Sequence, residues 1–211
     1  MTTRTRAAPT PPPELAAPIR RGRIALSLAG GLWALLLLPL TAADWGAPWV
    51  SALSRLEPWR ALRGAVDDPY VVFGALTGVS FLAIGAALLP DLRRARWGGT
   101  AFAVTILLGA IVTPISYLST PPTAPLHVLW GAEGPLLVVI GLAGVLAAVS
   151  ARGWRRWARA LLAVTLVVLV AGVLATGYYP HGPLIALSLE TAALLAGAPR
   201  GRPAAAVRPR R

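Results

Sequence analysis

The chain has 211 residues, of which 56% are hydrophobic and 13% charged, and its mean hydropathy is +0.65. So little polar surface cannot coat a water-soluble globule of this size, and the absence of cysteine excludes disulfides and thiolate metal sites. The formal net charge of +12 comes from 20 arginines clustered beside apolar segments, a pattern that favours a membrane over a nucleic-acid partner.

Six stretches are long, apolar and almost free of charge, each near the roughly 20 residues that a transmembrane helix needs. They cover residues 24–43, 70–90, 97–118, 128–150, 157–177 and 181–198. The sequence therefore predicts an all-α, polytopic transmembrane helical bundle with six spans over residues 24–198. The first span is longer than the apolar core of a cleaved signal peptide, so we expect it to be retained.

Arginine alternates between the segments that join these spans. The two tails and the loops after spans two and four are rich in arginine, whereas the loop of residues 44–69 holds only Arg55, Arg60 and Arg63 together with four acidic residues. By the positive-inside rule, both termini are expected in the cytoplasm, with the spans in a prokaryotic plasma (inner) membrane. Residues 1–23 and 199–211 are rich in arginine and proline, so we expect disordered cytoplasmic tails that contact anionic lipid headgroups.

The outer loop 44–69 is the longest between the spans. Its apolar residues recur at gaps of three or four, which indicates a short amphipathic helix in the membrane interface, interrupted at Pro58. They are Trp49, Leu53, Leu56, Trp59, Leu62 and Val66. A connector anchored by tryptophan is favoured over a lid.

The chain also matches itself when it is shifted by 60 positions. Residues 70–112 match residues 130–172 at 11 of 43 places, about twice the level expected for this composition. Arg96-Trp97 aligns with Arg156-Trp157, and both pairs open a predicted span. Spans two and three are therefore predicted to form a helical hairpin that is repeated in parallel as spans four and five.

Glu190 is the one formal charge placed deep in a predicted span. A carboxyl at that depth costs at least about 2.5 kcal/mol unless it is protonated, paired or facing water. A structural hydrogen bond to a neighbouring helix is the favoured interpretation, and a proton or cation site in a transport path is the second. The expected partners are Thr77, Ser80, Thr105, Thr113 and Ser188.

Other polar groups are expected to meet at the outer mouth of the bundle. Glu133 and His181 each precede a proline that is predicted to start a helix, so both should lie in the headgroup region with His127. Asp44, Tyr117, Tyr178 and Tyr179 are expected beside them. The spacing of the histidines and glutamates fits no metal motif, so neither a metal nor a cofactor is expected.

These features favour a non-enzymatic function. The leading hypothesis is a membrane-embedded accessory or scaffold component, with a membrane-protein partner, or a small-solute permease subunit with Glu190 as its working residue. The alternative is an outer-leaflet enzyme that acts on a lipid or lipid-linked substrate through Glu133, His181, His127 and Glu190. Those four side chains would then have to lie within about 5 Å of one another.

The predicted topology is testable with reporter fusions. A tag at position 55 should reach the outer compartment and a tag at position 155 the cytoplasm, because the arginines beside position 155 resist translocation. The measurement is the compartment-specific activity of each reporter. Two tags in the same compartment would contradict the six-span topology.

Overall fold

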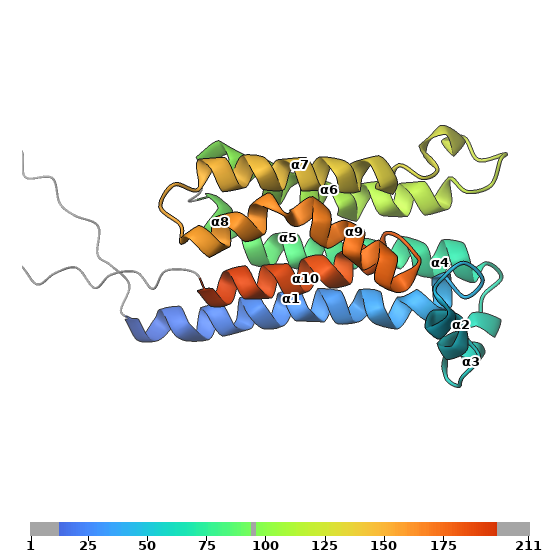
Figure 1. Cartoon of the computed structure of the whole chain (residues 1–211). Helices are drawn as coiled ribbons and strands as arrows, with labels where there is room; N and C mark the ends of the chain where they lie inside the picture. Colours follow the sequence, from blue (N-terminus) through green and yellow to red (C-terminus); the bar gives the residue numbers. More distant parts are fainter. Residues whose placement is uncertain (1–12, 94–95, 198–211) are drawn as a thin grey trace, which may run out of the picture.

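The computed structural model describes residues 13–93 and 96–197, which form helices and connecting turns without strands. The helices are α1 (Pro13–Thr41), α2 (Pro48–Ser54), α3 (Trp59–Gly64), α4 (Pro69–Leu76), α5 (Gly78–Leu92), α6 (Arg96–Leu118), α7 (Glu133–Ser150), α8 (Arg156–Ala163), α9 (Thr165–Thr176) and α10 (His181–Gly197), with a short 3-10 helix at His127–Leu129. Figure 1 shows the long helices side by side, with α2 and α3 at one end. The predicted all-helical class is therefore confirmed.

Four helical stretches are long and apolar enough to cross a membrane. They are Ala17–Thr41 in α1, Pro69–Leu92, which joins α4 and α5, Arg96–Leu118 (α6) and Glu133–Ser150 (α7). The pair α8 and α9 passes the same test as a fifth span, although it bends by 56° at Val164. Many large apolar side chains on these helices are exposed, as expected of surfaces that face lipid. The fold is thus a helical bundle with four or five candidate membrane spans.

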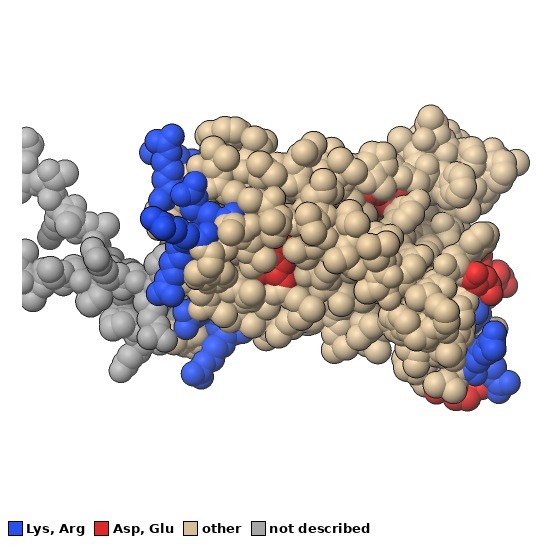
Figure 2. All heavy atoms as spheres, in the orientation of Figure 1, with Lys and Arg blue, Asp and Glu red and all other residues tan. Residues whose placement is uncertain are grey.

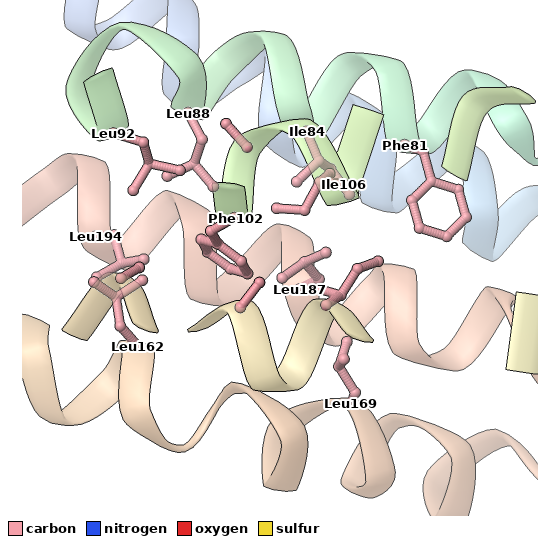
Figure 3. Close-up of a cluster of buried hydrophobic side chains, with 14 of the residues drawn as sticks. Phe81, Ile84, Leu88, Leu92, Phe102, Ile106, Leu162, Leu169, Leu187 and Leu194 are labelled. Carbon is pink, nitrogen blue, oxygen red and sulfur yellow. The ribbon is translucent and has the colours of Figure 1, made fainter. Parts of the chain in front are cut away.

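The helices form a closed ring in chain order. Each candidate span packs on the next, and α10 returns to pack on α1, so the ring closes between the first helix and the last. Helix α10 also contacts α5 and α8 across the bundle. Apolar side chains from α5, α6, α8, α9 and α10 point toward one another in the interior (Figure 3). This arrangement places α10 at the centre of the contacts within the bundle.

Two spans are interrupted along their length. At Thr77, between α4 and α5, the backbone N–H of Thr77 donates to Gly74 O and that of Ser80 donates to Thr77 O, which is i to i−3 bonding rather than i to i−4. At Val164, between α8 and α9, the chain turns by 56°. We refer to these as the Thr77 interruption and the Val164 bend. Hydropathy predicts neither, because the residues around Thr77 and Val164 are mostly apolar.

Some helix bounds differ from the predictions. Helix α1 begins at Pro13, so residues 13–23, expected to be disordered, are helical. Proline suits a first helical position because the N–H that it lacks would be unpaired there. At the other end of the bundle, α7 begins at Glu133 rather than residue 128, since the 3-10 helix and a turn at Gly131 precede it. The expected disorder of residues 1–12 and 199–211 lies outside the described residues.

Arginines gather at the end of the bundle where α1 begins and α10 ends (Figures 1 and 2). Arg23 of α1 donates from Nε to the backbone oxygen of Ala87 at 2.7 Å and pairs with Asp91 of α5 at 2.9 Å. Arg159 of α8 donates to Ala148 O near the end of α7 at 2.9 Å. Both arginines thus satisfy carbonyls in the last turns of neighbouring helices.

Tight packing of α1 on α10 depends on Gly31. A Cβ added at Gly31 would collide with the Ser188 side chain of α10, whereas a Cβ added at Gly22 of the same helix would meet nothing. Ser27 Oγ donates to Ser188 O at 3.0 Å beside this contact. Close approach at Gly31 therefore sets how α1 and α10 meet.

Gly31→Ala should lower the free energy of unfolding by about 1–3 kcal/mol, since the added methyl overpacks the α1–α10 contact. Gly22→Ala is the matched control and should leave stability unchanged or slightly raised, because alanine is the better helix former. Adding Ser188→Gly to Gly31→Ala should restore part of the loss. Reversible unfolding in mixed micelles measures all three, and equal stability of the two glycine variants would contradict the packing.

Candidate functional site

Glu190 lies near the middle of α10 and is buried, with 4% of its surface exposed. Its Oε1 atom is 2.7 Å from the hydroxyl of Thr165, the first residue of α9. Thr165 is not among the partners expected from the sequence, so that prediction of the partner is wrong. The second oxygen, Oε2, is also buried and has no hydrogen-bond partner among the described residues.

The bend at Val164 brings Thr165 to Glu190. Helix α8 ends just before it, and Thr165 opens α9, so the threonine lies where the helix changes direction. A Cβ at Gly144 of α7 would lie 2.7 Å from both Leu162 O and Thr165 Oγ1. The absence of a side chain at Gly144 therefore lets α7 pack directly against this bend.

His181 is the first residue of α10 and is fully buried. Its Nε2 atom lies 2.8 Å from the hydroxyl of Thr77, at the interruption between α4 and α5. Its Nδ1 atom is buried without a partner among the described residues, and its ring lies 5.5 Å from that of Tyr178. The expected position in the headgroup region, outside the helix, is corrected, because α10 begins two residues before Pro183 and carries His181 into the bundle.

The ionisable side chains of α10, His181 and Glu190, make contacts of the same kind. Each pairs an ionisable side chain of α10 with a threonine at the break of a neighbouring span: His181 with Thr77, and Glu190 with Thr165. Each threonine hydroxyl also donates to a carbonyl of the helix that precedes the break, Phe73 O in α4 or Leu162 O in α8. The positions of His181 and Glu190 differ by about 13 Å along the helix axis at 1.5 Å per residue.

Glu133 is the first residue of α7 and is buried, with 4% of its surface exposed, rather than lying outside its helix as expected. Its carboxyl bonds the side chain of Ser116 in α6, and Ser116 Oγ accepts a further bond from Gly131 N at 2.9 Å. The other carboxyl oxygen, Oε2, has no partner among the described residues. Glu133 therefore joins α7 to α6.

A tyrosine cluster lies beside Glu133 and His181. The hydroxyl oxygens of Tyr117 and Tyr178 are 3.1 Å apart, and the rings of Tyr70 and Tyr117 are 5.1 Å apart. Burial raises the pKa of Tyr178, so this phenol stays protonated and able to donate. Tyr70 is not among the residues predicted to lie here, although its place at the start of a span, directly after Asp68-Pro69, indicates the same end of the bundle.

The remaining candidates lie elsewhere. His127 is half-buried, with Nδ1 2.9 Å from Ser119 O and its ring stacked on Trp130. Asp44 is exposed and pairs with Arg63 at 3.4 Å. No three His, Asp or Glu side chains within residues 13–93 and 96–197 converge to hold a metal ion. The structure therefore gives His127, His181, Glu133 and Glu190 four separate sets of polar partners.

An apolar groove of about 520 Å³ runs between α9 and α10, with Glu190 in its wall. Small residues line much of it, including Ala171, Gly172 and Ala175 of α9 and Gly182 and Ala186 of α10. Leu161, at the end of α8, extends the lining to the bend. The groove thus brings the lipid-facing surface of the bundle next to the Glu190–Thr165 pair.

Thr77→Val should destabilise the bundle by about 1–3 kcal/mol, because it removes the one hydrogen bond of the His181 ring and leaves both ring nitrogens buried without partners. Thr100→Val is the matched control, since Thr100 is exposed and bonds only its own helix. The measurement is the unfolding free energy in mixed micelles. A loss no larger than that of the control would show that the Thr77–His181 contact contributes nothing.

The candidate site is thus α10 with the two breaks that it contacts, and a second polar cluster lies around Glu133. The first contains a carboxyl, an imidazole and two hydroxyl groups, and the second a carboxyl and a hydroxyl group. Such groups can exchange protons and orient small polar solutes. No protein-family model, curated protein or solved structure matches this chain.

Proposed function

We propose that the chain is a six-span protein of the prokaryotic plasma (inner) membrane with both termini in the cytoplasm. We count α8 and α9 together as one span and the 17 residues of α10 as another. With the four longer spans, these make six crossings, which is an even number. The arginines at one end of the bundle support this orientation, because positively charged segments stay on the cytoplasmic side (Figure 2). Anionic lipid headgroups are the proposed partners of these arginines.

Within this topology we propose a non-enzymatic function as a small-solute permease subunit. The observation that carries the proposal is the pairing of both ionisable residues of α10 with threonines at helix breaks. Discontinuous helices beside buried ionisable groups are characteristic of transporter sites, where a break frees backbone groups and allows movement. The Val164 bend and the Thr77 interruption supply such breaks on two helices that α10 contacts.

An accessory or scaffold role is the second candidate, and one observation favours it. The groove between α9 and α10 is lined by small residues on the outer surface of the bundle, where a helix of a membrane-protein partner can approach closely. The alternative of an outer-leaflet enzyme lacks a matching observation, since Glu133, His181, His127 and Glu190 bond to different partners.

The permease proposal predicts solute-dependent proton movement that needs Glu190. Liposomes that contain the protein and a pH-sensitive dye are given a membrane potential and then a panel of amino acids, sugars, organic acids or sodium. At least one class should produce a proton flux, and Glu190→Gln should reduce that flux at least tenfold, because glutamine cannot take up a proton.

Glu57→Gln is the control, since it makes the same chemical change at an exposed carboxyl that pairs with Arg60 away from both polar clusters. Glu190→Asp, which keeps an acid on a shorter side chain, should retain part of the flux. Flux that is the same for wild type and Glu190→Gln would exclude Glu190 from transport and favour the accessory role.

A further inference from the structure

We propose that Glu190 is a proton-binding site: its carboxyl carries a proton in the membrane-embedded bundle, and the α9–α10 groove gives hydrophobic reagents access to it from the bilayer. The proposal rests on the permease function only for its biological role, because it names the ligand at that site. Its chemistry depends on contacts around Glu190 that are present whether or not the protein transports a solute.

The hydrogen bonds of Thr165 favour a protonated carboxyl. Thr165 Oγ1 lies 2.8 Å from Leu162 O and 2.7 Å from Glu190 Oε1, and both of these oxygens would have to accept from it if the carboxyl were ionised. A hydroxyl has a single proton to donate. A protonated Glu190 solves the conflict: its O–H donates to Thr165 Oγ1, and the threonine then donates to Leu162 O.

The second carboxyl oxygen leads to the same conclusion. Oε2 of Glu190 is buried without a partner among the described residues. Burial of the unpaired carbonyl oxygen of a neutral acid costs far less free energy than burial of an unpaired carboxylate. Protonation therefore removes the larger of the two penalties.

Few charged groups lie on the helices that pack against α10. The described side chains of α1 contribute Arg20, Arg21 and Arg23, α5 contributes Asp91, α8 contributes Arg156 and Arg159, α9 contributes none, and α10 itself adds His181. Arg23 pairs with Asp91, and Arg159 bonds Ala148 O. Among the described residues, the polar interaction of the Glu190 carboxyl is with Thr165 alone, so no arginine neutralises it.

A proton suits this site better than a metal cation does. Among the described residues, the Glu190 carboxyl has one polar partner, the Thr165 hydroxyl, which in turn bonds Leu162 O. Hard metal cations usually take about six or more oxygen ligands. A proton needs one donor and one acceptor, and Glu190 with Thr165 supplies both.

Hydrophobic carbodiimides test for the proton directly. The acid O–H adds across one C=N bond of the carbodiimide: the carboxyl oxygen bonds to the central carbon and the proton moves to nitrogen. The resulting O-acylisourea rearranges to a stable N-acylurea, so no oxidant or reductant takes part. The apolar groove lets dicyclohexylcarbodiimide approach Glu190 from the lipid, whereas a water-soluble carbodiimide cannot enter the bilayer.

The experiment uses the full chain in phosphatidylcholine liposomes at pH 7, with the labelled position located by mass spectrometry. Dicyclohexylcarbodiimide should label Glu190, and a water-soluble carbodiimide should instead label Glu57, whose side chain is 55% exposed. Glu133→Gln should keep the label at Glu190. Absence of the label from Glu190 in the wild type would overturn the proposal, as would slower labelling when sodium is added at constant pH.

Infrared spectroscopy gives a second measurement that needs no reagent. A protonated carboxylic acid has a carbonyl stretching band that a carboxylate lacks, so Glu190→Gln should remove one such band from the spectrum at pH 7. An unchanged spectrum in the folded variant would contradict the proposal. Labelled Glu190 without any solute-dependent proton flux would sustain the proton site and reject only the permease function.

Discussion

Inside a bilayer, a polar group must find its partner within the protein, because the hydrocarbon offers none. In this bundle α10 provides hydrogen-bond partners for polar groups of three other helical segments. Its His181 and Glu190 side chains bond the threonines at the two breaks, and its Ser188 backbone oxygen accepts from Ser27 of α1. At each break the threonine hydroxyl bonds a carbonyl of the preceding helix and also a side chain of α10. The position of α10 thus determines whether the interruptions are stable.

Apolar length predicts the helical class of this protein well, whereas the orientation inferred from the arginines stays a prediction. Long runs without charge form helices. Asp68 and Pro69 indicate a helix start, and α4 begins there, with the Asp68 side chain accepting a hydrogen bond from Val71 N. Such features are local and follow from a few neighbouring residues. The six-span count and the hairpin repeat stay predictions. Under the repeat, Thr77 and Val164 correspond to Leu137 and Val104, which lie within unbroken helices.

The contacts of the candidate site were harder to predict, because they join residues far apart in the chain. Glu190 has several threonines and serines at plausible depth, and only the ring order and the 56° bend select Thr165. Pro135 and Pro183 were predicted to start their helices, but each is the third helical residue. Glu133 and His181 are therefore the first residues of α7 and α10, and both are buried. Helix starts are uncertain by a residue or two, and here that difference decides whether a side chain faces headgroups or the interior.

The closure of the ring by its last helix has a consequence for biosynthesis. While the chain leaves the ribosome, the helices up to α9 enter the membrane before α10 has been translated, and the hydroxyls of Ser27, Thr77 and Thr165 still lack their partners on it. During that interval the nascent bundle presents polar positions to lipid or to the insertion machinery. Quality-control proteases that recognise such positions can therefore distinguish a chain that lacks α10 from one in which α10 has packed.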